Sequence, residues 1–279
     1  MSSFPDSLFT PVLAIDNRIV SVLGSFRAIQ PQYEGVHEMG TRTFQEKKSA
    51  LPDANWAGLF KLGGVGAVIG GVLTVLDIMV YVVSPQPANI EGWFALFQRN
   101  WLVGLLDMDL LGMAIYIIVI PAIVALYISL RRGSQAWSAV ATVLTFVGMA
   151  AYFASNTGVS MISLSNQYAA ATTDAQRAMF LAAGEAAIST FFGPAFTTSF
   201  FLVTIALLII AVVMLRSEVF SKKTAWIGII AGVAGLGEQV PALGLLILVI
   251  ALVNAVGLGI WFVLIGRRLL QMSSSGLPT

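Results

Sequence analysis

Residues 103–132, VGLLDMDLLGMAIYIIVIPAIVALYISLRR, carry the pattern that decides the fold. Residues 103–129 are almost entirely apolar, and at about 1.5 Å per helical residue they can cross roughly 30 Å of hydrocarbon. Two aspartates stand near the beginning of this run, and Arg131 and Arg132 follow its end. The stretch therefore predicts a transmembrane helix with acidic groups toward one membrane surface and basic groups at the other.

Further apolar runs of this kind extend on both sides of the quoted stretch. They cover residues 59–83, 136–162, 192–215, 224–239 and 240–266, of which only 224–239 is short for a full crossing. The chain is 57% hydrophobic and 10% charged, which is typical of a multi-pass membrane protein. Backbone groups in lipid must be satisfied within each segment, and alternating strand patterns are absent, so we expect helices. The sequence predicts an all-α membrane bundle with six transmembrane helices.

The basic residues indicate how this bundle is oriented. Thirteen of the 15 lysines and arginines lie on one side of the six-span topology, and only Arg99 and Arg177 fall in the other set of connections. Because basic residues concentrate in cytoplasmic loops, both termini are predicted to be cytoplasmic. No cleavable signal peptide is recognisable in residues 1–30, so the first span would act as the insertion signal.

Three regions follow from this topology. Residues 1–58 are predicted to form a cytoplasmic N-terminal extension with an amphipathic helix, which could lie on the inner membrane face, on a partner or on the bundle itself. Residues 59–268 form the transmembrane domain, and residues 269–279 a cytoplasmic tail. In the external connection near residues 163–191, Thr173 and Gln176 make a capping box. We expect an external cap helix there, lying over the mouth of the bundle.

Several chemistries lack the residues that they need. The chain has no cysteine, and its single histidine, His37, lies outside every predicted span. We therefore expect no metal, no cofactor and no histidine- or cysteine-dependent enzyme chemistry. Phosphate-binding glycine motifs are absent, because the glycines of residues 63–71 lie inside a span without a phosphate-binding lysine. The prediction is a protein that is not an enzyme and has no nucleic-acid partner.

The candidate site is a set of polar residues near the outer membrane surface. Asp77 lies late in the first span, Asp107 and Asp109 lie early in the second, and Asn156 and Glu238 fall at a similar height. Charged residues inside a membrane suggest function, so one hypothesis is a cation or proton site built on Asp77 and Asp107. The other is that these groups bond to their neighbours and hold the helices together. The sequence favours the second hypothesis and opposes a proton pump, because the inner half offers no acidic or histidine step for a relay.

Two spans carry the GxxxG spacing that lets helix backbones approach closely. Gly66 and Gly70 form one such pair, and Gly228 and Gly232 form the other. The default expectation is packing within one chain, and a homodimer is the alternative.

Several short motifs suggest a family. They are residues 56–60 (WAGLF), residues 109–111 (DLL), residues 215–217 (LRS) and above all residues 163–185 (SLSNQYAAATTDAQRAMFLAAGE). Over roughly residues 55–268 the chain resembles the domain-of-unknown-function family numbered 4386 of bacterial multi-helix membrane proteins. The resemblance implies a multi-pass protein of the bacterial inner (plasma) membrane. It implies no activity and no catalytic residues.

Two functions are compatible with these features. The first is a non-catalytic accessory or structural subunit of a membrane complex, whose partners are the lipid bilayer and other membrane subunits. The alternative is a small-molecule or ion transporter that uses an outward-facing acidic pocket.

Overall fold

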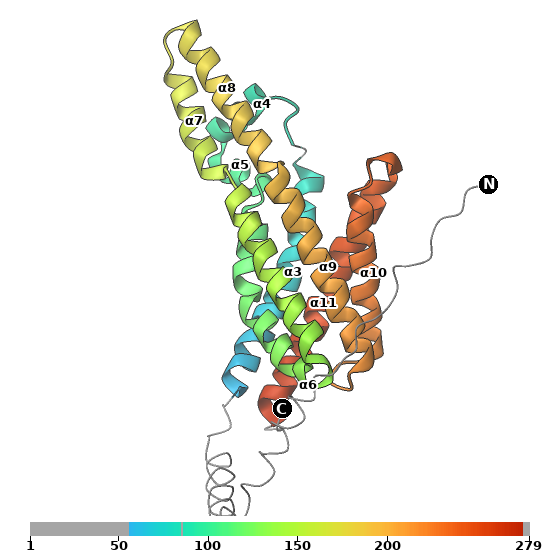
Figure 1. Ribbon diagram of the computed structural model, residues 1–279. Coiled ribbons are helices and arrows are strands. Elements are labelled where there is room, and N and C mark those ends of the chain that lie inside the picture. Colours follow the sequence, from blue (N-terminus) through green and yellow to red (C-terminus); the bar gives the residue numbers. More distant parts are fainter. Residues whose placement is uncertain (1–55, 85, 276–279) are drawn as a thin grey trace, which may run out of the picture. The chain divides into compact units, whose positions relative to one another are not determined.

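The computed structural model describes residues 56–84 and 86–275 (Figure 1). The predicted N-terminal amphipathic helix lies outside these residues. Within them the chain forms helices and no strand, which confirms the all-α class. The helices are α3 (Ala57–Val83), α4 (Ile90–Arg99), α5 (Trp101–Asp107), α6 (Leu110–Ser155), α7 (Gly158–Ala170), α8 (Asp174–Phe191), α9 (Pro194–Arg216), α10 (Lys222–Glu238) and α11 (Leu246–Ser275), with the short 3₁₀ helix η2 (Pro241–Leu243) before α11.

The long helix α6 is a hairpin of two arms, residues 110–133 and 135–155. Ser134 has non-helical backbone angles (φ −162°, ψ 82°) and follows Gly133, and such Gly-Ser pairs are common sites of sharp kinks. The rings of Tyr116 and Tyr152, one in each arm, have centroids 4.7 Å apart. A straight helix would separate these residues by about 54 Å, so the arms run antiparallel. The kink, the α6 turn, lies where the sequence predicts the connection between the second and third spans.

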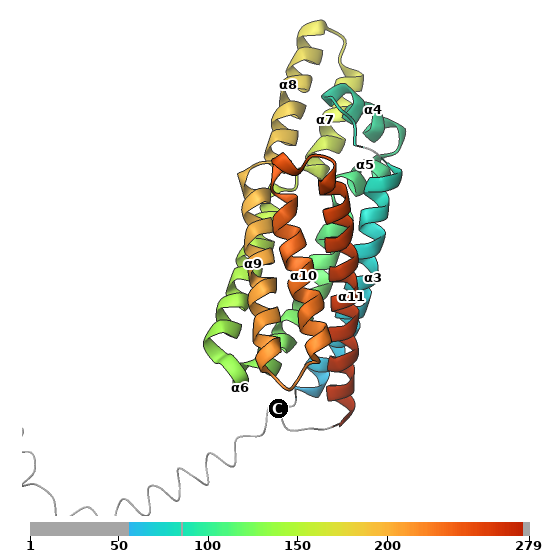
Figure 2. The ribbon, with the colours of Figure 1, turned by 90° about the vertical axis from the view of Figure 1, so that its right-hand side faces the viewer.

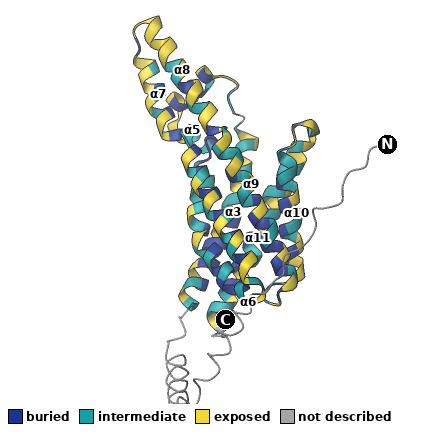
Figure 3. Ribbon diagram, in the orientation of Figure 1, coloured by how far each residue is buried: buried dark blue, intermediate teal, exposed yellow. Residues whose placement is uncertain are grey.

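Four helical stretches among the described residues are long and apolar enough to cross a membrane. They are Ala57–Val83, Leu110–Ala170, Asp174–Arg216 and Leu246–Ser274; the second joins α6 to α7, and the third joins α8 to α9. Many apolar side chains on them point outward, such as Leu62 and Val249, which are each 60% exposed. Figure 3 shows such exposed positions along the bundle helices. Apolar surface of this extent suits contact with lipid and is typical of a membrane protein.

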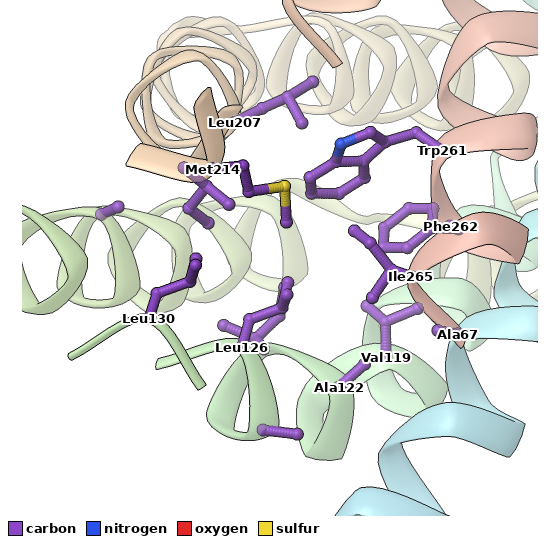
Figure 4. Close-up of a cluster of buried hydrophobic side chains, with 14 of the residues drawn as sticks. Ala67, Val119, Ala122, Leu126, Leu130, Leu207, Met214, Trp261, Phe262 and Ile265 are labelled. Atoms are coloured by element: carbon purple, nitrogen blue, oxygen red, sulfur yellow. The ribbon is translucent and has the colours of Figure 1, made fainter. Parts of the chain in front are cut away.

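The helices α3, α6, α9, α10 and α11 form a closed ring. Each packs against the next, and α11 returns to α3; Figure 2 shows α9, α10, α11 and α3 side by side in this order. The half of the ring nearer the α6 turn has an apolar core that includes Leu126, Met214, Trp261 and Ile265 (Figure 4). Apolar side chains from several helices therefore pack together in that half.

The predicted GxxxG faces pack within the chain. A Cβ atom on Gly66 would overlap the Ile118 carbonyl oxygen of α6, and one on Gly70 would lie 2.5 Å from Val119 Cγ1. In α10, a Cβ on Gly228 would lie 2.5 Å from Trp261 Nε1, and one on Gly232 2.6 Å from Leu208 Cδ2. Neighbouring helices of the same chain therefore cover both faces.

A second set of glycines joins α3 to α11. Each member faces a partner glycine reciprocally: a Cβ on Gly64 would lie 2.9 Å from Gly266 O, and one on Gly266 would lie 2.6 Å from Gly64 O. About two helical turns further along α3, a Cβ on Gly71 would lie 2.6 Å from Gly259 O, and one on Gly259 would lie 2.9 Å from Gly71 O. We call these four residues the glycine seam. It closes the ring between its first and last helices.

The helices α4, α5, α7 and α8 form a cap at the end of the bundle opposite the α6 turn. Their own apolar cluster includes Trp93, Phe94, Phe97, Met161 and Phe191. The capping box of Thr173 and Gln176 is present at the start of α8, as predicted. However, α8 does not lie across the mouth: it pairs with α7, and the two project beyond the bundle (Figure 1).

Several predicted span limits differ from the helices. The second begins at Leu110 instead of residue 103, because the preceding residues form the separate helix α5. The third ends at Ser155 instead of residue 162, where a short break precedes α7. The last begins at Leu246 instead of residue 240, because the chain around Pro241 forms η2. Its helix α11 then continues to Ser275, so the first residues of the predicted tail are helical.

Candidate binding site: an acidic cavity inside the helix ring

A cavity of about 480 Å³ occupies the half of the ring nearer the cap. Residues from α3, α6, α9, α10 and α11 line it, and three of them are acidic: Asp77, Asp109 and Glu238. Among the described residues that line the cavity, none is lysine, arginine or histidine. The chemistry of the walls therefore suits a cation or a hydrogen-bond donor and disfavours an anion.

Asp77 is the acid with the fewest protein partners. Its Oδ1 atom is buried and has no hydrogen-bond partner among the described residues. Tyr81 follows four residues later on α3 and therefore lies on the same helix face; both side chains line the cavity. Burial of a carboxylate oxygen without a donor is costly, so this position is one at which a bound donor would be stabilised.

Asp109 joins the cavity to the start of α6. Its backbone is left-handed (φ 64°), and it is the only non-glycine residue with positive φ in the described part of the chain. Aspartate tolerates this region better than most residues. Its carboxylate caps α6 by accepting a hydrogen bond from Gly112 N at 3.2 Å, and the Tyr152 hydroxyl donates a second one to it. Asp109 is thus largely committed to holding the two arms of α6 together.

Glu238 ends α10 on another wall of the cavity. It accepts a hydrogen bond of 2.6 Å from Asn254 Nδ2 of α11, and both residues line the cavity. The pair links α10 to α11 at the end of the ring nearer the cap. Asn254 is the one strongly polar residue between Leu246 and Gly266 of α11, and its contact with Glu238 gives it a hydrogen-bond partner in this apolar stretch.

Asp107 and Asn156 are absent from the lining of the cavity. Asp107 is fully buried, and its carboxylate accepts a hydrogen bond of 2.8 Å from the Ser84 hydroxyl. Burial raises the pKa of the Asp107 carboxyl above its usual value, while the Ser84 hydrogen bond opposes this rise. Asn156 Nδ2 donates to Met108 O at 2.8 Å. Both residues hold the junction of bundle and cap, so the structure brings Asp77 together with Asp109 rather than with Asp107.

Aromatic rings form much of the remaining wall. They belong to Tyr81, Tyr116, Tyr152, Phe192, Phe196 and Phe200. The ring centroid of Tyr152 lies 4.7 Å from that of Tyr116 and 6.1 Å from that of Phe196. Sequence reasoning missed this cluster, because its members are dispersed over α3, α6, α9 and the connection between α8 and α9. The four-residue spacing of Asp77 and Tyr81 was the one local signal.

A smaller apolar pocket of about 120 Å³ adjoins the cavity on the side of the core. The two share a wall made by Ile115, Tyr116, Phe200, Asn254 and Leu258. Deeper lining residues include Met149, Leu207 and Trp261. The cavity is thus acidic and aromatic, and the adjoining pocket is apolar.

The acids of the cavity are not arranged as a metal centre. Within residues 56–84 and 86–275, no group of three or more histidine, aspartate or glutamate residues could hold a metal ion together.

Comparison with known proteins assigns a family. The family described as Domain of unknown function (DUF4386) matches residues 108–266, which is more than half of the chain. The chain belongs to this family. The match to DUF4386 covers α6 to α10 and most of α11, and so includes Asp109 and Glu238, whereas α3 with Asp77 lies before it. No curated protein and no solved structure matches the chain.

Proposed function

We propose that this DUF4386 protein binds a small molecule or ion in an outward-facing acidic cavity, as a transporter does in one state of its cycle. The observation that carries the proposal is the cavity of about 480 Å³ with three acids and no basic residue among its described lining. The opposite half of the ring supports it, because an apolar core packs there and the glycine seam holds α3 against α11. We expect the cavity to open only at the cap end, as alternating access requires of a single state.

The proposal includes a topology of six spans in the bacterial inner membrane, with both termini cytoplasmic. The six spans would be α3, the two arms of α6, α9, α10 and α11. In support, Arg131 lies 5.9 Å from the Trp56 ring centroid, and Arg268 Nε donates to Val219 O at 2.7 Å. Basic residues thus gather around the α6 turn, which would face the cytoplasm by the positive-inside rule.

Single-cysteine labelling tests both the cavity and the topology, because the chain contains no cysteine. Ala255→Cys, in the cavity wall, should react in intact cells with a thiol reagent that cannot cross the membrane. Gly133→Cys, exposed at the α6 turn, should react only after permeabilisation. Ala206→Cys, which is 0% exposed in the core, is the unreactive control. Protection of Ala255→Cys in intact cells would refute an outward-facing cavity.

Transport is tested with cells that express the protein at matched levels. Expression of the wild-type protein should change the uptake of, or the resistance to, some members of a panel of charged and neutral compounds. Asp77→Asn should abolish this change. Glu185→Gln on the exposed side of α8 removes a carboxylate outside the cavity and should leave the phenotype intact. Equal phenotypes for the two variants would argue against transport through this site.

A second candidate function is an accessory subunit of a membrane complex. The cap favours it, because α7 and α8 project from the bundle with apolar side chains exposed, among them Val159 (76%) and Met179 (58%). Purification in mild detergent should then recover a stable partner whose association depends on this hairpin. Recovery of a lone monomer would count against the accessory role.

A further inference from the structure

We propose that the cavity recognises an organic cation that carries an apolar group, with the charged head near Asp77 and the apolar part in the deeper pocket. The inference rests on the proposed function, because it names the ligand class of the same site. Four features of the cavity carry it: its charge, its aromatic rings, its unpartnered polar atoms and the apolar pocket behind it.

The charge of the walls selects a cation. Asp77, Asp109 and Glu238 line the cavity without a basic counterpart among the described lining residues. Asp109 is bonded to Gly112 and Tyr152, and Glu238 to Asn254. Asp77 is left as the carboxylate free to pair with a ligand.

The surroundings of Asp77 suit an organic cation better than a metal ion. The acids are too dispersed to hold a metal together within the described residues. Aromatic rings of Tyr81, Tyr116 and Tyr152 line the same space, and the face of such a ring attracts an ammonium group through its quadrupole. Carboxylate and aromatic groups together are the usual surroundings of bound ammonium heads.

Two polar atoms in the cavity wall have no hydrogen-bond partner in the described part of the chain. The buried Asp77 Oδ1 is one, and Ser199 Oγ, on a residue that is 1% exposed, is the other. The Tyr116 hydroxyl lies close to Ser199, but the two do not meet the geometry of a hydrogen bond. Buried polar atoms are normally paired, so a polar group that enters the cavity would complete what the protein leaves open.

The deeper pocket provides for an apolar substituent. Its volume of about 120 Å³ is somewhat below the roughly 150 Å³ of an apolar protein cavity that binds benzene, and its wall consists mostly of aliphatic and aromatic side chains. Leu258 and Phe200 border both spaces. We expect a ligand with its cationic head beside Asp77 to place its apolar group in this pocket, with Leu258 and Phe200 contacting both parts.

Binding to the purified full chain in lipid nanodiscs tests the inference. The probe is benzyltrimethylammonium, compared with its neutral isostere neopentylbenzene, in which carbon replaces the charged nitrogen, and with tetramethylammonium, which lacks the ring. We expect benzyltrimethylammonium to bind at least about tenfold more tightly than either. Such a ratio corresponds to the loss of one good charge contact or of the buried ring.

Variants assign the two halves of the ligand to the two halves of the site. Asp77→Asn should weaken binding of both cations by about tenfold or more, and Glu185→Gln should leave it unchanged. Leu258→Trp should weaken benzyltrimethylammonium selectively, and retained binding of tetramethylammonium would show that the variant is folded.

The outcomes separate the ligand class from the proposed function. Equal binding of the neutral isostere, or no binding of benzyltrimethylammonium while Ala255→Cys is accessible, overturns the inference and leaves the cavity in place. An inaccessible Ala255→Cys in the wild-type background overturns the proposed function itself.

Discussion

The glycine seam between α3 and α11 yields the most quantitative prediction. In Gly71→Ala the new Cβ would lie 2.6 Å from Gly259 O, 3.0 Å from Val263 Cγ2 and 3.1 Å from Phe262 Cβ. Ordinary contact begins at 3.4 Å, so the two helices must separate by about 0.8 Å at this point. Overpacking of this kind costs about 1–3 kcal/mol. The gain in helix propensity of about 1 kcal/mol recovers part of this cost, which leaves a net loss of about 0–2 kcal/mol.

The matched control lies in the same helix. A Cβ on Gly58 would meet nothing within 4 Å, so Gly58→Ala should be neutral or stabilising by up to about 1 kcal/mol. The free energy of unfolding is measured by reversible SDS titration in mixed micelles, followed by tryptophan fluorescence. The double variant Gly71→Ala/Gly259→Ala should lose less free energy of unfolding than the sum of the two single losses, because one separation of the helices relieves both contacts. If Gly71→Ala proves as stable as Gly58→Ala, the seam does not constrain the ring as we infer.

Three further predictions concern the polar residues. Tyr152→Phe removes the hydroxyl that donates to the buried Asp109 carboxylate and should destabilise the protein by about 1–3 kcal/mol in the same assay; Tyr168→Phe in the cap is the control, and equal losses would contradict the role of Tyr152. Asp109→Ala should lower the free energy of unfolding by about 1 kcal/mol through the missing N-cap and by a further 1–2 kcal/mol through the left-handed backbone. Asp109→Asn should lower it less, because asparagine can cap a helix and tolerates positive φ. A larger loss for Asp109→Asn than for Asp109→Ala would be inconsistent with this geometry. Because burial raises the pKa of Asp107, the folded protein keeps this proton at pH values where the unfolded chain has lost it, so stability should fall as pH rises from about 4 toward the raised pKa. Asp107→Asn should flatten that part of the pH profile, and an unchanged profile would exclude Asp107 as its source.

Features set by local pattern could be predicted from the sequence. The apolar runs led to the helices of the bundle, and the Thr173 capping box to the start of α8. Glycine spacing indicated that Gly66, Gly70, Gly228 and Gly232 pack closely, and they do so within the chain. Errors occurred where a polar or turn residue interrupts an apolar run, as at Asp109 and Pro241, because hydropathy does not register a helix cap or a short 3₁₀ turn.

The candidate site was predicted only in part. The sequence identified Asp77, Asp109 and Glu238 as outer polar residues, but it coupled Asp77 to Asp107. Residues two apart on a helix point in nearly opposite directions, and the sequence could not decide which of Asp107 and Asp109 faces inward. The left-handed backbone at Asp109 and the reach of Tyr152 across the α6 hairpin make that choice.

By itself, then, the sequence determined the helical class, the apolar segments and the separation of basic from acidic residues, because each depends on neighbours along the chain. Only the tertiary structure decided that five elements close into a ring, that Gly64 and Gly71 meet Gly266 and Gly259, and that acids and tyrosines from separate helices line one cavity. The physical reason is that hydrophobic burial requires a helix to enter the membrane but does not specify its rotation or its neighbour. Close packing of glycines and the pairing of buried polar groups supply that information, and both act between residues far apart in the sequence.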